Sequence, residues 1–525
     1  MAGFIRSLTL ILAAVPAFAQ SPEYDIWISG GRILDGAGNP WFVGDVGIKG
    51  DTIAYVGPSR TATARQFLDA RGKMVTPGFI DTHSHGRRGV FEVPSAENQI
   101  RQGVTTIIEG PDGSSPLPIG EYLTRFSKVP ATTNFGLLVG QGTVRERVIG
   151  LKDRKATAEE IKRMREMVRQ AMREGAFGLS TGLFYVPGAF TPIEEVIELA
   201  KVAGEMGGIY TSHMRDEAAG IADSVKELIR IGEEGHLPAQ ITHHKVMSGK
   251  NWGKSAETLQ LVEAARRRGV DISIDQYPYT ASSTGLAALV PKWALESGQK
   301  SFRERAGAPE QRARMRVDIV RNLKEDRGSG DLKNVVFASC AGDRSLAGKN
   351  LRDLTGSDDF EKAAEHVIRL QEQGGCSCIY HAISEADVER IMRYPGTMIA
   401  SDGGIPVFGE DVPHPRNYGT FARVLGRYVR ERNVLSLEDA VRRMTSLPAA
   451  RFRIPDRGLL RPGMKADVTV FDAGTVIDKS EFAKPHQYAE GFSHVLVNGT
   501  PVLVDGKMLP ARPGRALFGP GHGNQ

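Results

Sequence analysis

The chain has 525 residues, of which 41% are hydrophobic and 25% charged. These proportions exclude collagen, a coiled coil and global disorder. The 67 Lys and Arg residues exceed the 62 Asp and Glu residues by only five charges, and a dedicated nucleic-acid binder concentrates more positive charge than that. At roughly 150 residues per domain, the length suits about three domains or one large α/β barrel with additions.

The N-terminus has the three parts of a secretory signal peptide. Arg6 supplies the positive charge, residues 8–15 form an apolar run, and Ala17 to Ala19 form an A-x-A cleavage site. The apolar run is too short to span a bilayer. We therefore expect residues 1–19 to be removed and the protein to be exported, periplasmic or secreted, with no membrane contact afterwards.

The cysteines do not suggest a disulfide framework. Only Cys340, Cys376 and Cys378 are present, which is too few for a scaffold of disulfides. The C-x-C pair is a conceivable metal ligand, but we expect buried strand cysteines instead.

Both ends of the mature chain show the pattern of short β-strands. Period-two alternation between Gly, Asn and Asp residues marks residues 25–28, 45–48, 52–56, 466–471 and 494–499. We expect residues 20–75 and 455–525 to complete one small β-sandwich domain.

Between these ends, residues 76–454 alternate short apolar strands with amphipathic helices. Three helix starts carry capping residues, at Thr157, Thr191 and Ser436. The strand candidates are residues 105–108, 135–139, 209–212, 240–243, 271–275 and 397–400. Such alternation predicts parallel βαβ units and, in closed form, a (β/α)8 TIM barrel with its active site at the carboxyl ends of the strands. A polar segment at residues 291–333 interrupts the pattern and is interpreted as an insertion.

Ionisable residues gather at the predicted strand ends. His83 and His85 follow an apolar strand as H-x-H, and period two points both imidazoles to one face. The other candidates are Glu109, Asp112, His213, His243, His244 and Asp402. Imidazole and carboxylate groups suit zinc and related divalent metals. The pattern indicates a mononuclear or dinuclear metal centre.

Two segments resemble the amidohydrolase superfamily: residues 75–85, its first-strand signature, and residues 458–468, its return into the terminal β domain. A set of further motifs resembles the D-aminoacylase (N-acyl-D-amino-acid deacylase) family more closely. These motifs are residues 182–187, 213–217, 243–245, 277–279, 401–403 and 414–416, and they follow in order over almost the whole mature chain.

The resemblance implies a role for each matching residue. His83, His85 and Asp402 are expected to form one metal shell, and His213 and His243 the second, tighter site, with His244 in support. Asp402 is expected to be the general base and later the acid. Tyr185 is expected to polarise the scissile carbonyl. The substrate carboxylate is expected to meet Lys245, Tyr277, Ser283 and Arg416.

The chain departs from that family at two places. Asp112 stands where the family has a metal-binding Cys, and the nearby Glu109 is an alternative bridging ligand. A carboxylate is a harder ligand than a thiolate, so Mn²⁺ or Co²⁺ is an alternative to Zn²⁺. Gln141 stands where a His is expected, and no lysine on that strand is available to bridge two metals as in hydantoinase-like relatives.

The leading hypothesis is therefore metal-dependent hydrolysis of small N-acyl-D-amino acids, with one or two Zn²⁺ ions. One alternative keeps the fold and changes the substrate to a cyclic amide, a β-aspartyl dipeptide or another D-configured dipeptide. Another is a non-catalytic binding protein on the same scaffold. The oligomeric state, the preferred side chain and the acyl group stay open.

Overall fold

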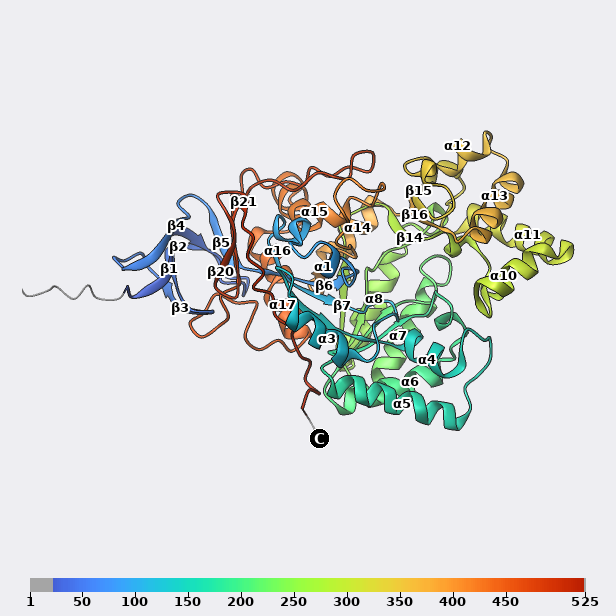
Figure 1. Ribbon diagram of the computed structural model, residues 1–525, viewed down its shortest axis with the longest axis horizontal. Helices are drawn as coiled ribbons and strands as arrows, with labels where there is room; N and C mark the ends of the chain where they lie inside the picture. Colours follow the sequence, from blue (N-terminus) through green and yellow to red (C-terminus); the bar gives the residue numbers. More distant parts are fainter. Residues whose placement is uncertain (1–21, 524–525) are drawn as a thin grey trace, which may run out of the picture.

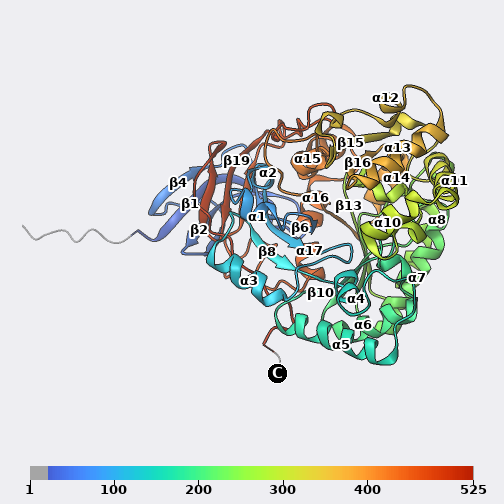
Figure 2. The same ribbon diagram turned by 45° about the vertical axis from the view of Figure 1, so that its right-hand side comes forward.

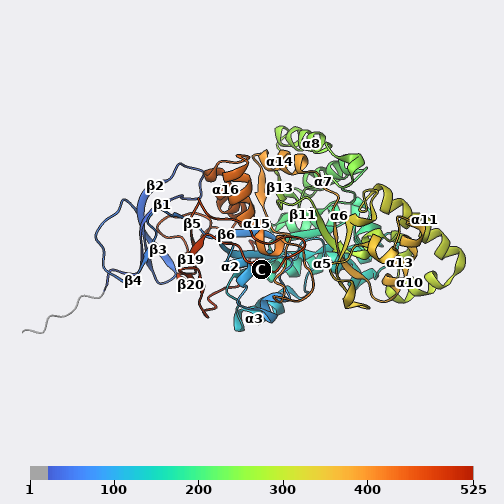
Figure 3. The ribbon, with the colours of Figure 1, turned by 90° about the horizontal axis from the view of Figure 1, so that it is seen from above.

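The computed structural model describes residues 22–523, and the expected signal peptide lies outside them. A β domain, a barrel and a helical insertion follow one another along the long axis of the molecule (Figure 1). The view from above shows the same order (Figure 3). Within residues 22–523, no helix has the length and apolar character that crossing a membrane requires.

Both ends of the chain build the β domain, as the sequence predicts. Its strands are β1 (Tyr24–Ile33), β2 (Phe42–Lys49), β3 (Thr52–Gly57), β4 (Ala64–Asp69), β5 (Met74–Pro77), β18 (Val468–Phe471), β19 (Phe492–Val497), β20 (Thr500–Val504) and β21 (Lys507–Met508). They join in the order β21-β20-β19-β18-β5-β1-β2-β3, with β4 beside β1. β18 pairs antiparallel with β5, so N-terminal and C-terminal strands lie side by side (Figure 2). Ile28, Val46, Val468 and Leu496 share one buried core there.

Parallel strands form the barrel. They are β6 (Phe79–Ser84), β7 (Val104–Glu109), β8 (Asn134–Leu137), β9 (Val139–Gly140), β10 (Gly178–Gly182), β11 (Ile209–His213), β12 (Ala239–Ile241), β13 (Ile272–Gln276) and β17 (Thr397–Ile399). β8 pairs with β7, and β9 pairs with β10, so these two short strands share one position. A parallel bridge between Ser84 and Gly403 joins β6 to the end of β17 and closes the ring. All six strand candidates correspond to strands, although residues 135–139 fall on both β8 and β9, and residues 240–243 extend past the end of β12 at Ile241.

Helices cover the outside of the barrel. The principal ones are α3 (Ile119–Lys128), α4 (Gln141–Ile149), α5 (Ala158–Arg173), α6 (Ile193–Glu205), α7 (Ile221–Gly235), α8 (Ser255–Arg267), α14 (Glu385–Arg393), α15 (Arg416–Arg423), α16 (Leu437–Met444) and α17 (Ser446–Arg451). The predicted caps at Thr157 and Ser436 are confirmed. The predicted cap at Thr191 is wrong, since Pro192 occupies the N-cap position of α6. The Thr191 hydroxyl bonds instead to the Pro187 carbonyl and the Gln141 amide.

The interruption of the barrel extends beyond residues 291–333. It includes a three-stranded antiparallel sheet of β14 (Ser282–Gly285), β15 (Val335–Cys340) and β16 (Cys376–Tyr380). Its helices are α9 (Lys292–Leu295), α10 (Gly298–Gly307), α11 (Pro309–Glu325), α12 (Leu351–Thr355) and α13 (Phe360–Glu372). Strands and helices also alternate in this insertion, so the sequence pattern of its outer parts is the same as that of the barrel.

The insertion holds all three cysteines. Cys340 and Cys376 are partners across β15 and β16 and form a disulfide, and Cys378 is free. All three are buried strand residues, as expected. The disulfide itself was not predicted, since a count of three gave no pairing.

A buried polar network joins the β domain to the barrel. Arg457 pairs with Asp467 and donates to the Asn498 amide oxygen at 2.9 Å. Asn134, on β8, donates to Asp467 at 3.0 Å and accepts from Asn498 at 2.7 Å. Arg457 and Asp467 are 4% and 5% exposed, so each charge depends on the other.

Asp467→Asn is expected to destabilise the protein. It keeps the shape of the side chain but leaves the buried Arg457 guanidinium with only the exposed Asp456 carboxylate, 3.8 Å away, and breaking a buried pair costs roughly 3 kcal/mol or more of the free energy of unfolding. Urea denaturation followed by circular dichroism measures the loss. The exposed Asp223→Asn is the control and leaves the midpoint unchanged; an equal midpoint for both variants would show that the network adds no stability.

Candidate metal centre

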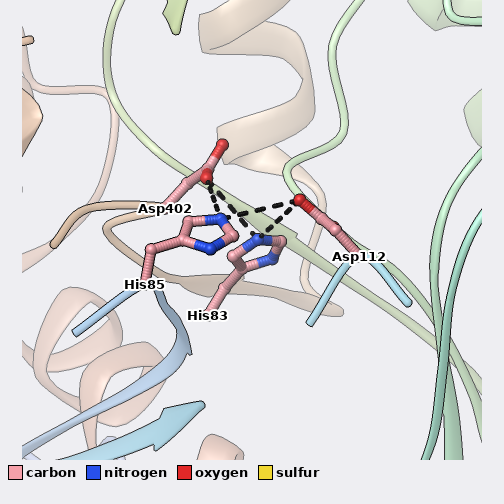
Figure 4. A group of neighbouring side chains, drawn as sticks. All are labelled: His83, His85, Asp112 and Asp402. Carbon is pink, nitrogen blue, oxygen red and sulfur yellow. Dashed lines mark hydrogen bonds and ion pairs between the residues drawn. The ribbon is translucent and has the colours of Figure 1, made fainter. Parts of the chain in front are cut away.

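The predicted ligand residues meet at one end of the barrel. β6 carries His83 near its end, β11 ends at His213, and His243 and Asp402 follow β12 and β17. Because these strands are parallel, their carboxyl ends share one rim. Asp112 reaches the same place from the turn after β7. Figure 4 shows His83, His85, Asp112 and Asp402 pointing toward one another.

One group consists of His83, His85, Asp112 and Asp402, whose ligand atoms all lie within 4.8 Å of one another. His85 Nε2 is 3.0 Å from Asp402 Oδ1, and His83 Nε2 is 3.5 Å from the same oxygen. Both Nε2 atoms lie 3.6 Å from Asp112 Oδ2. Two imidazoles and two carboxylates therefore face a common point.

Asp112 also belongs to a second group, with His213 and His243. Its Oδ2 is 3.8 Å from His213 Nδ1, and its Oδ1 is 3.4 Å from His243 Nε2. A carboxylate shared between two such groups has the geometry to bridge two metal ions. The other candidate bridge, Glu109, joins neither group: its Oε2 accepts from the Gly110 amide at 2.6 Å, and its Oε1 lies 3.7 Å from Arg87 Nε.

Unsatisfied buried atoms support a metal at these groups. His83 Nε2, His213 Nδ1, His243 Nε2 and Asp112 Oδ1 are buried and have no hydrogen-bond partner among the described residues. Leaving such an atom unpaired costs on the order of 1–3 kcal/mol. Divalent cations bind these nitrogens and oxygens, so the residues present fit a metal.

The backbone is strained at three of these residues. Asp112, His243 and Asp402 have φ values of 55°, 37° and 48°, in the left-handed region that residues with a Cβ seldom adopt. Conformations of this kind persist where the surroundings enforce them, and they concentrate at functional sites.

Glu217 is a functional candidate to which the sequence motifs assign no role. Its Oε2 lies 3.4 Å from His213 Nε2, and its Oε1 lies 3.3 Å from His243 Nδ1. These are the ring nitrogens turned away from Asp112, so the Glu217 carboxylate lies behind both rings, where outer partners of metal-binding histidines lie. The Lys245 ammonium is closer still to His243 Nδ1, at 2.8 Å. The four-residue spacing in His213-Met-Arg-Asp-Glu217 was the available signal.

Two further residues have structural partners. The His244 Nε2 bonds to the Thr258 hydroxyl at 2.8 Å, in agreement with a supporting role. The Gln141 amide donates to the Thr191 hydroxyl at 3.1 Å and belongs to neither metal group.

A cavity of about 540 Å³ opens onto the metal groups. Of the expected substrate residues, Tyr185, Lys245, Ser283 and Arg416 line it. Tyr277 lies behind this wall, where its ring centroid is 4.8 Å from the Arg416 guanidinium carbon.

Arg416 links the cavity to Asp402. Its Nη1 donates to Asp402 Oδ2 at 2.8 Å, and its Nη2 donates to the Ser283 carbonyl at 3.2 Å. Burial raises the pKa of Asp402, but the charges of Arg416 and His83 outweigh it and hold that pKa well below its usual range. Asp402 is therefore an ionised carboxylate at neutral pH.

Lys245 and Tyr185 occupy the side of the cavity near the second group. The Lys245 ammonium lies 2.5 Å from Glu217 Oε1, and burial lowers its pKa. The Tyr185 hydroxyl shares a hydrogen bond of 3.1 Å with the Thr284 hydroxyl. The centroid of the Tyr185 ring is 4.6 Å from that of the His213 ring. Burial raises the pKa of Tyr185, so the hydroxyl keeps its proton and can donate it.

Comparisons with known proteins extend over the whole fold. The amidohydrolase family model matches residues 66–503. The D-aminoacylase of Alcaligenes xylosoxydans xylosoxydans is 36% identical over 95% of this chain and 98% of its own. The N-acyl-D-glutamate deacylase of Bordetella bronchiseptica, solved with zinc and a phosphonate mimic of the tetrahedral intermediate, is 34% identical, with a TM-score of 0.81 over 94% of this chain and 99% of that one.

A D-aminoacylase structure that describes a binuclear metal centre is 36% identical, with a TM-score of 0.81 over 94% of this chain and 100% of that one. The identity and coverage, together with a metal-binding His and Asp cluster at the strand ends, show that this chain belongs to the amidohydrolase family and, within it, to the D-aminoacylase group.

Proposed function

We propose that this protein hydrolyses the linear amide bond of N-acyl-D-amino acids, releasing a carboxylate and the free D-amino acid. The observation that carries the proposal is the pairing of Arg416 with Asp402 at 2.8 Å on the wall of the cavity that reaches the metal groups. It puts a guanidinium suited to a substrate carboxylate beside an ionised carboxylate whose oxygens are free of protons and can accept one.

The metal is proposed to be zinc, as one or two ions. His83, His85 and Asp402 would hold one ion, His213 and His243 the other, and Asp112 would contact both. A bound divalent metal polarises the carbonyl and lowers the pKa of the attacking water. The harder Asp112 ligand favours tolerance of Mn²⁺ or Co²⁺ in place of Zn²⁺.

The residues of the chain move the protons and hold the substrate. Asp402 accepts a proton from the attacking water at a carboxylate oxygen and later delivers it to the departing amine nitrogen. The Tyr185 hydroxyl donates to the carbonyl oxygen, where negative charge develops. Arg416, Lys245 and Ser283 hold the α-carboxylate, and Tyr277 packs against the Arg416 guanidinium.

Two anchored groups make the site selective for one configuration. With the α-carboxylate and the scissile carbonyl both fixed, only hydrogen and the side chain remain to exchange at the α-carbon. The opposite isomer must clash with the wall or lose an anchor. We take the direction of this preference, D over L, from the similarity of the chain to the D-aminoacylase group.

The test compares kcat/KM for N-acetyl-D- and N-acetyl-L-methionine. We expect the D isomer to react faster by on the order of 10² or more, because a misplaced charged contact costs a few kcal/mol in the transition state. Asp402→Asn is expected to lower kcat by about 10² to 10⁴-fold, whereas Asp223→Asn keeps wild-type turnover. Equal rates for the two isomers would reject the anchoring, and full turnover in Asp402→Asn would reject the base.

Metal content tests the shared carboxylate. Asp112→Ala removes a ligand from both groups, so we expect it to lose metal from both, whereas His85→Ala loses at most one ion. Glu109→Gln is the matched control and keeps its metal, since Glu109 joins neither group. Mass spectrometry of the metal after dialysis decides: full occupancy in Asp112→Ala, or loss in Glu109→Gln, would contradict this assignment.

We further propose that the protein is exported to the periplasm or secreted. The disulfide between Cys340 and Cys376 supports this, because structural disulfides persist in oxidising compartments. Sequencing of the N-terminus after expression in the native host is expected to find a mature chain beginning near Gln20. Retention of Met1 in the main population would contradict export.

A further inference from the structure

The cavity has a cationic residue that the proposed mechanism does not use. Arg327 follows α11 in the insertion, lines the same cavity as Arg416, and is 1% exposed. A guanidinium buried to that extent requires anionic or polar partners to offset its lost hydration.

The partners of Arg327 are incomplete. Its Nη2 lies 3.2 Å from Glu217 Oε2, but its Nε is buried without a hydrogen-bond partner. Glu217 also receives the Lys245 ammonium at 2.5 Å and faces His213 and His243. One carboxylate therefore serves two cations.

A second cation lies against the same aromatic ring as Arg327. The Lys292 Nζ is 3.7 Å from the Phe184 ring centroid, and the Arg327 guanidinium carbon is 4.3 Å from it. No ion pair to Lys292 occurs within residues 22–523. Burial, with the nearby charge of Arg327, lowers the pKa of Lys292 to about 7.

The nearby acids do not balance these charges. Lys245 and Arg327 are two cations and Lys292 is partly protonated, whereas the carboxylates beside them are Glu217 and Asp326. Asp402 also lies near Lys245, but its charge is paired with Arg416 at 2.8 Å. Burial raises the pKa of Asp326, which weakens it as a counter-charge. The charge around Arg327 is therefore net positive. An anion can reach it from the open cavity, because Arg327 lines that cavity.

We propose that Arg327, assisted by Lys292, binds a second carboxylate of the substrate, so that the preferred substrates are N-acyl derivatives of acidic D-amino acids. This inference rests on the proposed function. The second carboxylate belongs to the amino-acid side chain, because Glu217 brings Arg327 next to Lys245, one of the residues that hold the α-carboxylate. Arg327 is thus a specificity-determining residue supplied by the insertion.

The experiment measures kcat/KM for N-acetyl-D-glutamate, N-acetyl-D-glutamine and N-acetyl-D-methionine with the metal-loaded protein. Glutamine matches glutamate in shape and lacks only the charge. We expect the wild type to prefer glutamate over glutamine by on the order of 10²-fold, as removal of one partner of a buried charge pair predicts. A ratio near one in the wild type would overturn the inference.

Variants separate recognition from structural support. Arg327→Met is expected to lower the glutamate-to-glutamine ratio to near one, mainly through KM for glutamate, and Arg327→Lys to restore part of it. Lys292→Met lowers the ratio less. Lys324→Met, an exposed cation at the end of α11 packed on the Phe360 ring, keeps the wild-type ratio.

An equal loss of kcat/KM for all three substrates in Arg327→Met, with normal metal content, would overturn the inference in favour of support through Glu217. The proposed function is tested separately by the same panel. Hydrolysis of the methionine substrate without that of glutamate rejects only the second-carboxylate site. Hydrolysis of none of the three rejects the proposed function.

Discussion

The closure of the barrel between its first and last strands is the constraint on which the metal centre depends. The Asp402 amide donates to the His83 carbonyl at 2.8 Å, and the His85 amide donates to the Gly403 carbonyl at 2.7 Å. The buried Asp81 carboxylate adds to this seam by accepting from the Ser401 and His83 amides at 2.9 and 3.2 Å. These contacts bring Asp402 beside two histidines that lie more than 300 residues earlier. The strained φ of Asp402 is enforced by the same seam.

Glu217 has a comparable part on the other side of the centre. Its two oxygens face the outer nitrogens of His213 and His243, and the same oxygens take the charges of Lys245 and Arg327. Orientation of the rings and the charge balance of the cavity are therefore coupled through one carboxylate. The barrel supplies most of the residues that carry the chemistry, and the insertion adds Ser283 and Thr284, on β14, and Arg327 to the cavity wall.

The sequence predicted the barrel, the two-ended β domain and the clustering of His83, His85, His213, His243 and Asp402. It could do so because short apolar strands that alternate with amphipathic helices are recognisable in a sequence. The residues after such parallel strands must all lie at the same end of the barrel. It left Glu109 and Asp112 as alternatives, since both follow the same strand. Only the turn at Asp112, with its positive φ, carries that side chain into both groups while the Glu109 carboxylate caps the next amide.

Arg327 acts from outside this pattern and could not be predicted from it. The outer strands of the insertion alternate like barrel strands, so the sequence underestimated its extent, and nothing in the spacing of Arg327 relates it to a strand end. Its position results from how α11 packs on α10 and α13 within the insertion, and from the turn after α11, where the Ser329 hydroxyl accepts from the Gly249 amide at 2.8 Å. Tertiary packing of this kind leaves no periodic trace in the sequence. The barrel fold determines where the strand-end residues lie, whereas the position of Arg327 depends on the insertion in this particular chain. For that reason the metal centre could be inferred from the strand pattern and the reaction from the resemblance to the D-aminoacylase family, whereas the proposed preference for an acidic side chain comes only from the structure.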